Sequence, residues 1–232
     1  MLRELMDVSR IRRQIAEALG SDRYSHLGLD DLDRKLGRYL DVRDGFFVEA
    51  GANDGLRQSN TYWFEKFRNW RGVLVEGVPE LARACRKNRP RSRVFEVALV
   101  GDEATDHVTM QTANLMSVVQ GAFASAEADA AHVKKGAAVQ RLAPEEVRSI
   151  RVSARTLTSV LSEVRPARFD LLSLDVEGFE LEVLRGLDLA RYKPRYILVE
   201  ARSVDALDAV LLATHTRIDQ LSHHDYLYRV NP

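Results

Sequence analysis

The sequence predicts a doubly wound α/β fold, with a mainly parallel sheet of seven strands covered by helices on both faces and a helical extension before it. From Phe46 onward, short apolar stretches alternate with helical stretches, which is the pattern of βαβ units. The apolar stretches are hydrophobic at nearly every position, as expected of strands buried on both faces of a sheet. The chain of 232 residues is 45% hydrophobic and 29% charged, which suits one such domain.

We expect residues 1–45 to form an N-terminal helical extension. A first helix is predicted over residues 2–19, ending at Gly20, and a second helical stretch over about 29–41. The first helix is amphipathic because its apolar residues recur at spacings near three and four, namely Leu2, Leu5, Met6, Ile11, Ile15 and Leu19. This extension is expected to cap the sheet, to close over a ligand, or to pair with another subunit in a homo-oligomer.

Residues 46–232 are expected to form the main domain. Its central strands are predicted at 46–51, 72–77, 93–100, 169–178 and 195–201, with helices near 59–68, 79–89, 155–164, 179–186 and 203–213. The stretches "TRIDQLSHH" and "DYLYRV" are expected to form an antiparallel edge pair. Residues 121–147, rich in alanine, interrupt the alternation. We expect them to be a lid or a substrate-side insertion, or else a tolerated surface helix.

Charge and cysteine content limit the expected partners. Lys and Arg total 34, as do Asp and Glu, so the zero net charge gives no reason to expect nucleic acid. The basic stretch 83–93 is expected to be the solvated end of a helix and the turn after it. Cys85 stands alone, which fits a packing residue in a reducing compartment. No apolar run is long enough to span a membrane and no secretory signal is evident, so we expect a cytoplasmic protein.

Carboxylates and small residues gather where the predicted strands end, which is where doubly wound sheets bind ligands. In chain order these residues are Glu49, Gly51, Asn53, Asp54, Gly55, Ser59, Asn60, Glu76, Ala98, Asp175, Glu177 and Glu200. The stretch "GANDG" lacks the middle glycine of G-x-G-x-x-G, and no G-K-[ST] occurs. A phosphate-binding turn is therefore not predicted.

The acids suit a ligand that carries a cationic amine and sugar hydroxyls, such as S-adenosylmethionine (SAM). Glu49 and Asp54 are expected to favour its cationic methionine end, and Glu76 to accept hydrogen bonds from both ribose hydroxyls. Glycines let the backbone approach the ligand. The complete predicted cofactor-binding set is Glu49, Gly51, Asn53, Asp54, Gly55, Ser59, Asn60, Glu76 and Ala98. For any single strand-end glutamate, a helix cap or a solvated terminus is the alternative.

Transfer of a methyl group to a hydroxyl requires a base that takes the proton of the hydroxyl. We expect Asp175 to be this base or the residue that orients the substrate, with Glu177 second. His224, beside His223, is a third candidate, and a solvated surface position is the alternative for both histidines. Asp175 and Glu200 are also candidate ligands for Mg²⁺. No Cys/His spacing predicts zinc.

The sequence resembles the FkbM-type class I methyltransferases. The resemblance rests on "FFVEAGANDG" at 46–55, "SNT" at 59–61, "WRGVLVE" at 70–76, "RTLTSVL" at 155–161, "LDVEGFELEVLRGL" at 174–187, "YILVE" at 196–200 and the final "DYLYRV". It implies a Rossmann-like fold, SAM as the cofactor and O-methylation of a hydroxyl on a sugar, a polyketide or another small secondary metabolite. Gly77 and His26 depart from the residues common in the family at these positions.

Two other functions stay open from the sequence. An NAD-dependent oxidoreductase on a similar fold is disfavoured by the missing glycine pattern. A methyltransferase-like protein without catalysis, acting as a binding partner in a complex, has the same strand-end acids and is not excluded by them.

Overall fold

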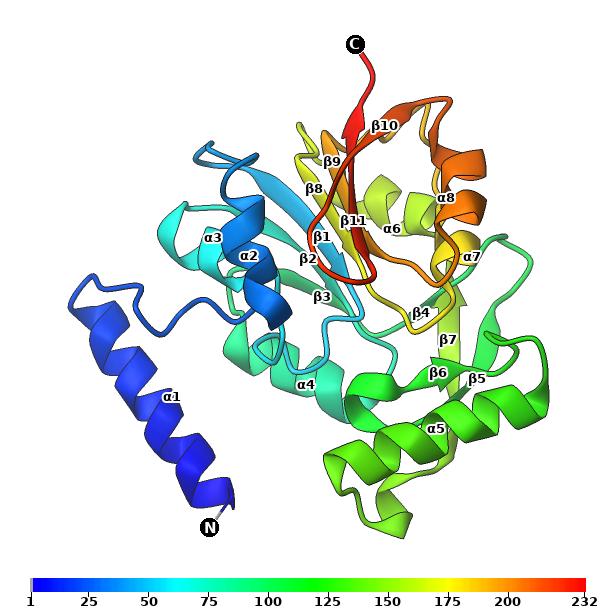
Figure 1. The fold of residues 1–232 in the computed structure, drawn as a ribbon, viewed down its shortest axis with the longest axis horizontal. Coiled ribbons are helices and arrows are strands. Elements are labelled where there is room, and N and C mark those ends of the chain that lie inside the picture. Colours follow the sequence, from blue (N-terminus) through cyan, green and yellow to red (C-terminus); the bar gives the residue numbers. More distant parts are fainter. Residues whose placement is uncertain (1) are drawn as a thin grey trace.

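The computed structural model describes the backbone of residues 2–232 and the side chains of residues 8–232. Its main sheet has seven strands in the order β10-β11-β9-β8-β1-β2-β3 (Figure 1). The strands are β1 (Phe46–Ala50), β2 (Arg71–Val75), β3 (Arg93–Phe95), β8 (Leu171–Leu174), β9 (Tyr196–Glu200), β10 (His215–Gln220) and β11 (Asp225–Val230). The sheet is mixed, because β3, β2, β1, β8 and β9 run parallel whereas β11 is antiparallel to both β9 and β10.

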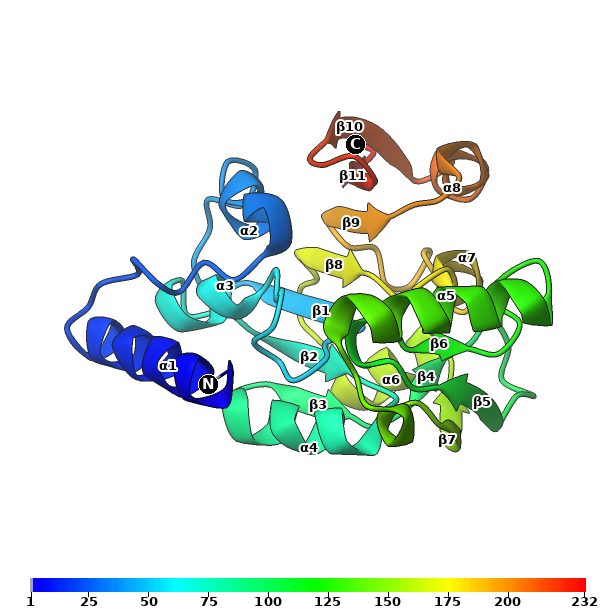
Figure 2. The same ribbon diagram turned by 60° about the horizontal axis from the view of Figure 1, so that its bottom comes forward.

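Helices cover both faces of this sheet (Figure 2). One face carries α2 (Leu32–Leu36), α3 (Tyr62–Phe67) and α4 (Pro79–Asn88), and the other α6 (Leu157–Val164), α7 (Glu180–Arg185) and α8 (Val204–Leu211). Successive strand residues point to opposite faces. Phe47 and Leu171 therefore pack with the first group of helices, while Val48 and Leu172 pack with the second. Both faces of the main sheet are buried by these helices, which is why its central strands are apolar at nearly every position.

A second sheet, absent from the sequence-based expectation, has the order β4-β7-β5-β6. Its strands are β4 (Ala98–Leu99), β5 (His107–Gln111), β6 (Val118–Val119) and β7 (Ser149–Arg155). The stretch 93–100, expected to be one strand, is two: β3 pairs with β2 in the main sheet, and after a bend at Val97 the chain pairs with β7 as β4. One continuous apolar run in the sequence thus contributes a strand to each of two different sheets.

The alanine-rich stretch 121–147 contains α5 (Ala126–Gln140), which lies over the second sheet (Figure 1). Val133 of α5 packs with Ala113 and Val118 in a small cluster of its own, and Gly136 lies so close to Met116 that an added Cβ would be 2.6 Å from its side chain. The short 3-10 turns η2 (Asn114–Met116) and η3 (Pro144–Glu146) precede and follow α5 in the chain. The helix is anchored by few apolar contacts.

The N-terminal helix α1 (Leu2–Ala18) lies outside α3 and α4 and is attached by polar contacts (Figure 1). Glu17 accepts hydrogen bonds from the Tyr62 hydroxyl at 2.7 Å and from the Ser25 hydroxyl at 2.8 Å, and lies 3.2 Å from Lys66 Nζ. The apolar residues whose side chains are described point outward, namely Val8, Ile11, Ile15 and Leu19. The predicted apolar positions Leu2, Leu5 and Met6 fall outside the described side chains.

The short 3-10 turn η1 (Leu29–Asp31) and α2 connect α1 to the first strand. Leu32, Leu36 and Leu40 are buried against Phe47 and Trp70, so the later part of the extension belongs to the packed body. The division of the chain at residue 45 and a homo-oligomer through these helices stay predictions. Among residues 2–232, no helix combines the length and the apolar character that a membrane crossing requires.

Candidate functional site

A pocket lies at the carboxyl ends of β1, β2 and β8 and continues onto the second sheet. With the open space at its mouth, it has a volume of about 810 Å³. Of the residues predicted from the sequence, it is lined by Glu49, Gly51, Asn53, Glu76, Ala98, Asp175 and Glu177. Residues from strands far apart in the chain thus meet at the sheet edge where doubly wound folds bind ligands.

Gly51 brings the end of β1 against the end of β8. Its φ is +82°, and a Cβ at this position would lie 1.7 Å from the backbone oxygen of Asp175. No side chain fits there, so glycine is required both by the left-handed backbone and by the close approach. This contact sets Asp175 beside the loop that follows β1.

Glu76, at the end of β2, is fixed by backbone donors. Its Oε2 accepts a hydrogen bond from the Asn53 N–H and its Oε1 from the Val78 N–H, both at 2.8 Å. Burial raises the pKa of Glu76 to about 7, although these hydrogen bonds oppose the shift. Each oxygen keeps a second lone pair. The carboxylate is therefore held in one orientation and can accept further hydrogen bonds from a ligand.

The wall beside Glu76 is apolar and comes from the second sheet. Ala98, Met110 and Val119 line the pocket there, on β4, β5 and β6. A Cβ on Gly77 would lie 2.5 Å from Met110 Sδ, so the glycine lets β5 approach the turn after Glu76. An apolar wall next to a hydrogen-bonding carboxylate suits a nucleoside, because the base of a nucleoside is largely apolar and its ribose carries hydroxyls.

Glu49 reaches the pocket, but its carboxylate is engaged inside the protein. Its Oε1 accepts a hydrogen bond from the Asn60 N–H at 2.8 Å, and its Oε2 accepts from the hydroxyls of Ser59 at 2.9 Å and Thr61 at 2.6 Å. These bonds hold the segment that leads into α3. The structure thus shows Glu49 shaping the loop, and its contact with a cofactor stays a prediction.

Arg89, at the end of α4, is fully buried beneath the same loop. Its Nη1 donates to the backbone oxygen of Gly55 and to Ser59 Oγ, its Nη2 to Thr61 Oγ1 and its Nε to Glu65 Oε2, all at 3.0 Å. The expectation that residues 83–93 are solvated is wrong for this residue, because two buried carboxylates neutralise it. Nothing in the basic stretch distinguishes Arg89 from its exposed neighbours.

Four other predicted cofactor residues, Asp54, Gly55, Ser59 and Asn60, do not line the pocket. Asp54 Oδ1 accepts from the backbone N–H groups of Leu56 at 2.9 Å and Arg57 at 2.7 Å, which closes the turn. Gly55 packs against Arg89, and Ser59 belongs to the network around Glu49. They build the loop around the pocket, and direct binding by them stays a prediction.

A second pocket adjoins the first, with a volume of about 1430 Å³ including the open space at its mouth. Asp175 and Glu177 line both pockets, and Glu200 and His224 line the second. Asp175 is reached by water from this side, yet protein surrounds its carboxyl group closely enough to desolvate it. This desolvation and the negative charge of nearby Glu200 raise the pKa of Asp175 well above its ordinary value.

Glu177 sits in a left-handed backbone conformation, with φ at 56°. Its Oε2 lies 3.1 Å from His132 Nε2, and desolvation, with Glu200 nearby, raises its pKa to about 8. Non-glycine residues with positive φ are uncommon and concentrate at functional sites. Three more of them line the first pocket, namely Asn53, Gln58 and Asn114.

His224 lies at the open side of the acid group. Its Nε2 is 3.4 Å from Glu200 Oε1, and its side chain is 44% exposed. His223 is exposed and does not line the pocket. Asp175 and Glu200 are neighbours, as the Mg²⁺ hypothesis requires, but among the described side chains no group of three or more His, Cys, Asp or Glu residues is arranged to hold a metal ion.

Sequence reasoning missed the wall of the second pocket that faces these acids. It is formed by Phe123, by His132 and Lys135 of α5, and by Arg202 after β9. No motif marks them, because three of the four lie in the alanine-rich insertion, and the fold alone carries that insertion over the strand ends. These four residues are separated from one another along the chain, so the sequence does not indicate that they share a site.

Residues 49–230 match the model of the methyltransferase FkbM domain. Solved structures similar to the chain include a TehB-like SAM-dependent methyltransferase from Corynebacterium glutamicum, 10% identical with a TM-score of 0.43 over 97% of each chain. The human methyltransferase 10 domain containing protein is 10% identical with a TM-score of 0.47, over 100% of this chain and 97% of that one.

A third similar structure is the 1,6-didemethyltoxoflavin-N1-methyltransferase of Burkholderia thailandensis, with 1,6-didemethyltoxoflavin and S-adenosylhomocysteine bound. It is 15% identical with a TM-score of 0.42, over 99% of this chain and 90% of that one. With TM-scores this low, the assignment of a family rests on the domain match. A comparison with curated proteins gives no match.

Proposed function

The chain belongs to the FkbM methyltransferase family, and from this premise we propose that it transfers a methyl group from SAM to a hydroxyl oxygen of a small metabolite. The proposal includes the finer expectations of a secondary metabolite, such as a sugar or a polyketide, and of a reaction in the cytoplasm. The observation that carries it is the position of Asp175, whose side chain borders both pockets.

The first pocket fits SAM by the chemistry of its residues. Glu76 offers fixed carboxylate oxygens to the ribose hydroxyls, and the wall with Ala98 and Met110 suits the adenine ring. Asp175 places a carboxyl group at the other end of the pocket, which suits an ammonium group. When bound, SAM supplies an electrophilic methyl group on a positively charged sulfur.

The second pocket would hold the acceptor. Asp175 stands at the junction of the two pockets, where a hydroxyl oxygen must lie for its proton to be removed as the new bond forms. A carboxylate of raised pKa is a stronger base than an ordinary one. Asp175 is exposed on the open side, where it neighbours Glu200 and where Glu200 lies 3.4 Å from His224, so the proton has an exit there.

The other functions are less well supported. For an oxidoreductase, the turn after β1 would have to bind a pyrophosphate, whereas this turn carries the carboxylate of Asp54, which accepts hydrogen bonds from the backbone N–H groups of Leu56 and Arg57. A binding protein without catalysis would not need an acceptor pocket that meets the cofactor pocket at a base. Mg²⁺ would have to be held by Asp175 and Glu200 with water as the remaining ligands.

The test is transfer of a labelled methyl group from SAM to a panel of hydroxylated metabolites, in the presence of EDTA or of Mg²⁺. We expect a labelled O-methyl product from the wild-type protein and none from Asp175→Asn, with S-adenosylhomocysteine binding retained by the variant. A product formed only with Mg²⁺ supports the metal-assisted form. Undiminished transfer by Asp175→Asn contradicts the assignment of the base.

A further inference from the structure

The wall of the acceptor pocket that faces the acids is cationic. Arg202 extends from the loop after β9, and its guanidinium carbon lies 3.7 Å from the centre of the Phe123 ring. Its Nη2 is 3.5 Å from His132 Nδ1 and 3.7 Å from Glu177 Oε2. Stacking on the ring holds the plane of the guanidinium group, so Arg202 is oriented before any ligand arrives.

The remaining donors of Arg202 are free within residues 8–232, since neither its Nε nor its Nη1 makes a hydrogen bond there. Its side chain is 45% exposed, so these donors face the open pocket. Free N–H donors of an arginine form strong, charge-assisted hydrogen bonds to the oxygens of a carboxylate or a phosphate.

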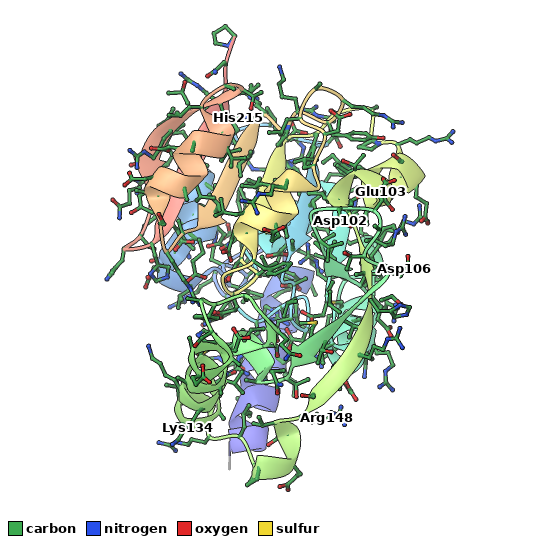
Figure 3. All side chains as sticks on the ribbon, turned by 90° about the vertical axis from the view of Figure 1, so that its right-hand side faces the viewer. Asp102, Glu103, Asp106, Lys134, Arg148 and His215 are labelled. Atoms are coloured by element: carbon green, nitrogen blue, oxygen red, sulfur yellow. The ribbon has the colours of Figure 1, made fainter. Side chains whose placement is uncertain are left out.

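Lys135 adds a second positive charge to the same wall. It lies three residues after His132 on α5, hence on the same side of the helix, and lines the acceptor pocket. Within the described part of the chain it forms no ion pair and no hydrogen bond. Its neighbour Lys134 lines a different pocket from the acceptor pocket and lies at the outer edge of α5 (Figure 3).

Within residues 8–232, the only ion pair that either of these two cations forms is the contact of Arg202 Nη2 with Glu177 Oε2, at 3.7 Å. This contact occupies Nη2 of Arg202, the nitrogen that also approaches His132, and leaves Nε and Nη1 of Arg202 and the ammonium group of Lys135 unpaired in the part of the chain that the structure describes. Glu200 faces His224 as well as Asp175. His132 adds no charge, because burial and the nearby Arg202 and Lys135 lower its pKa. Arg202 and Lys135, the two basic side chains that line the acceptor pocket, therefore lie on one wall of it.

We propose that Arg202 and Lys135 bind an oxyanion of the methyl acceptor, so that the acceptor is a hydroxylated acid, bearing a carboxylate or a phosphate, rather than a neutral sugar or polyketide. This inference rests on the proposed function, since it assumes that the second pocket holds the acceptor. Arg202 and Lys135 then determine specificity: they fix the acid group at one wall and leave the hydroxyl to face Asp175.

Inorganic phosphate and acetate are suitable probes, because each carries the recognised group without the rest of the acceptor. Each is titrated into protein saturated with S-adenosylhomocysteine, and amide chemical shifts are followed by NMR. We expect saturable shifts around residues 128–140 and 200–204 with at least one anion, and binding weaker by about tenfold or more in the double variant Lys135→Gln/Arg202→Gln. Stronger binding of phosphate or of acetate identifies the acid group.

Lys134→Gln is the matched control, since it removes a lysine from the same helix outside the pocket and should leave anion binding unchanged. Absence of anion binding in the wild-type protein, or equal binding in the double variant, overturns the proposal. The S-adenosylhomocysteine titration reports separately on the proposed function. Anion binding without S-adenosylhomocysteine binding would mean that the cationic wall is real and the methyltransferase assignment is wrong, whereas the reverse result would remove only the acid from the acceptor.

Discussion

Arg89 and Glu49 form a buried ion pair beneath the loop that borders the proposed cofactor pocket, with Arg89 Nη1 at 3.6 Å from Glu49 Oε2. Arg89 is fully buried and also pairs with Glu65, so one cation faces two carboxylates. Buried ion pairs add little net stability over apolar packing, but loss of one partner leaves the other charge uncompensated. This pair therefore ties the shape of the pocket to the folding of the domain.

Replacement of Arg89 by methionine should lower the free energy of unfolding by about 3–5 kcal/mol, because Glu49 and Glu65 would then be buried without a counter-charge. Urea denaturation measures this. Arg86→Met is the control on the same helix: its ion pair with Glu96 is exposed, so its loss should cost at most about 1 kcal/mol. Equal losses in the two variants would show that the buried pair has no special role.

Gly51 should tolerate no side chain. Gly51→Ala places a Cβ 1.7 Å from the Asp175 backbone oxygen, in addition to the cost of a left-handed φ, so we expect a loss of more than about 3 kcal/mol in unfolding free energy. Gly121→Ala is the matched control, with φ at +88° and no atom within 4 Å of the added Cβ. This replacement should lower the free energy of unfolding only by the cost of a left-handed φ at a non-glycine residue, about 1–2 kcal/mol. A similar cost at both positions would contradict the close approach of β1 and β8.

Stability should fall as the pH rises, owing in part to Glu177. Its pKa is about 8 in the folded protein against an ordinary 4.5, so the folded state binds more protons. Its contribution is fully present below about pH 4.5 and is lost as the pH rises through about 8. Glu177→Gln should reduce the fall in thermal midpoint between pH 5 and pH 8.

Glu163→Gln is the control for this pH dependence. Arg155 lowers the pKa of Glu163, so its ionised form is already favoured in the folded state. Its replacement should not reduce the fall between pH 5 and pH 8. A Glu177→Gln protein with the same pH dependence as the wild type would contradict the raised pKa and the desolvation behind it.

Binding of S-adenosylhomocysteine should strengthen as the pH rises from 6 to 8. In the free protein, burial holds the pKa of Glu76 at about 7. Hydroxyl donors of a bound ribose favour the ionised carboxylate, so binding releases a proton and becomes tighter as the pH rises through this value. Calorimetry in buffers of different ionisation enthalpy measures the proton release, and the absence of release near pH 7 would argue against contact with Glu76.

The centre of the main sheet could be predicted from the sequence because β1, β2, β8 and β9 are each a short apolar run of their own. Residues 93–100 show the limit of this reasoning, since the run looks continuous although β3 and β4 belong to different sheets. The rest of the second sheet gave no signal: β6 has two residues, and β5 is buried in full only at Met110. Its position is set by packing between segments distant in the chain.

For the site, the sequence indicates which residues gather at the strand ends but not which way their side chains turn. Glu76 and Glu49 look alike as acids near strand ends, yet Glu76 accepts backbone hydrogen bonds beside the pocket whereas Glu49 faces Arg89 and three residues of its own loop. The distinguishing partner, Arg89, lies in a basic stretch that predicts exposure. Such a pairing becomes visible only in the folded chain.

The most direct test of the account is a calorimetric titration of the wild-type protein and of Glu76→Ala with S-adenosylhomocysteine, with NAD⁺ as the control ligand and circular dichroism to verify folding. We predict saturable binding to the wild-type protein, binding weaker by about tenfold or more in the folded variant, and no response to NAD⁺. No binding of S-adenosylhomocysteine to folded, ligand-free wild-type protein, or equal affinity in the variant, would contradict the assignment of this pocket to SAM.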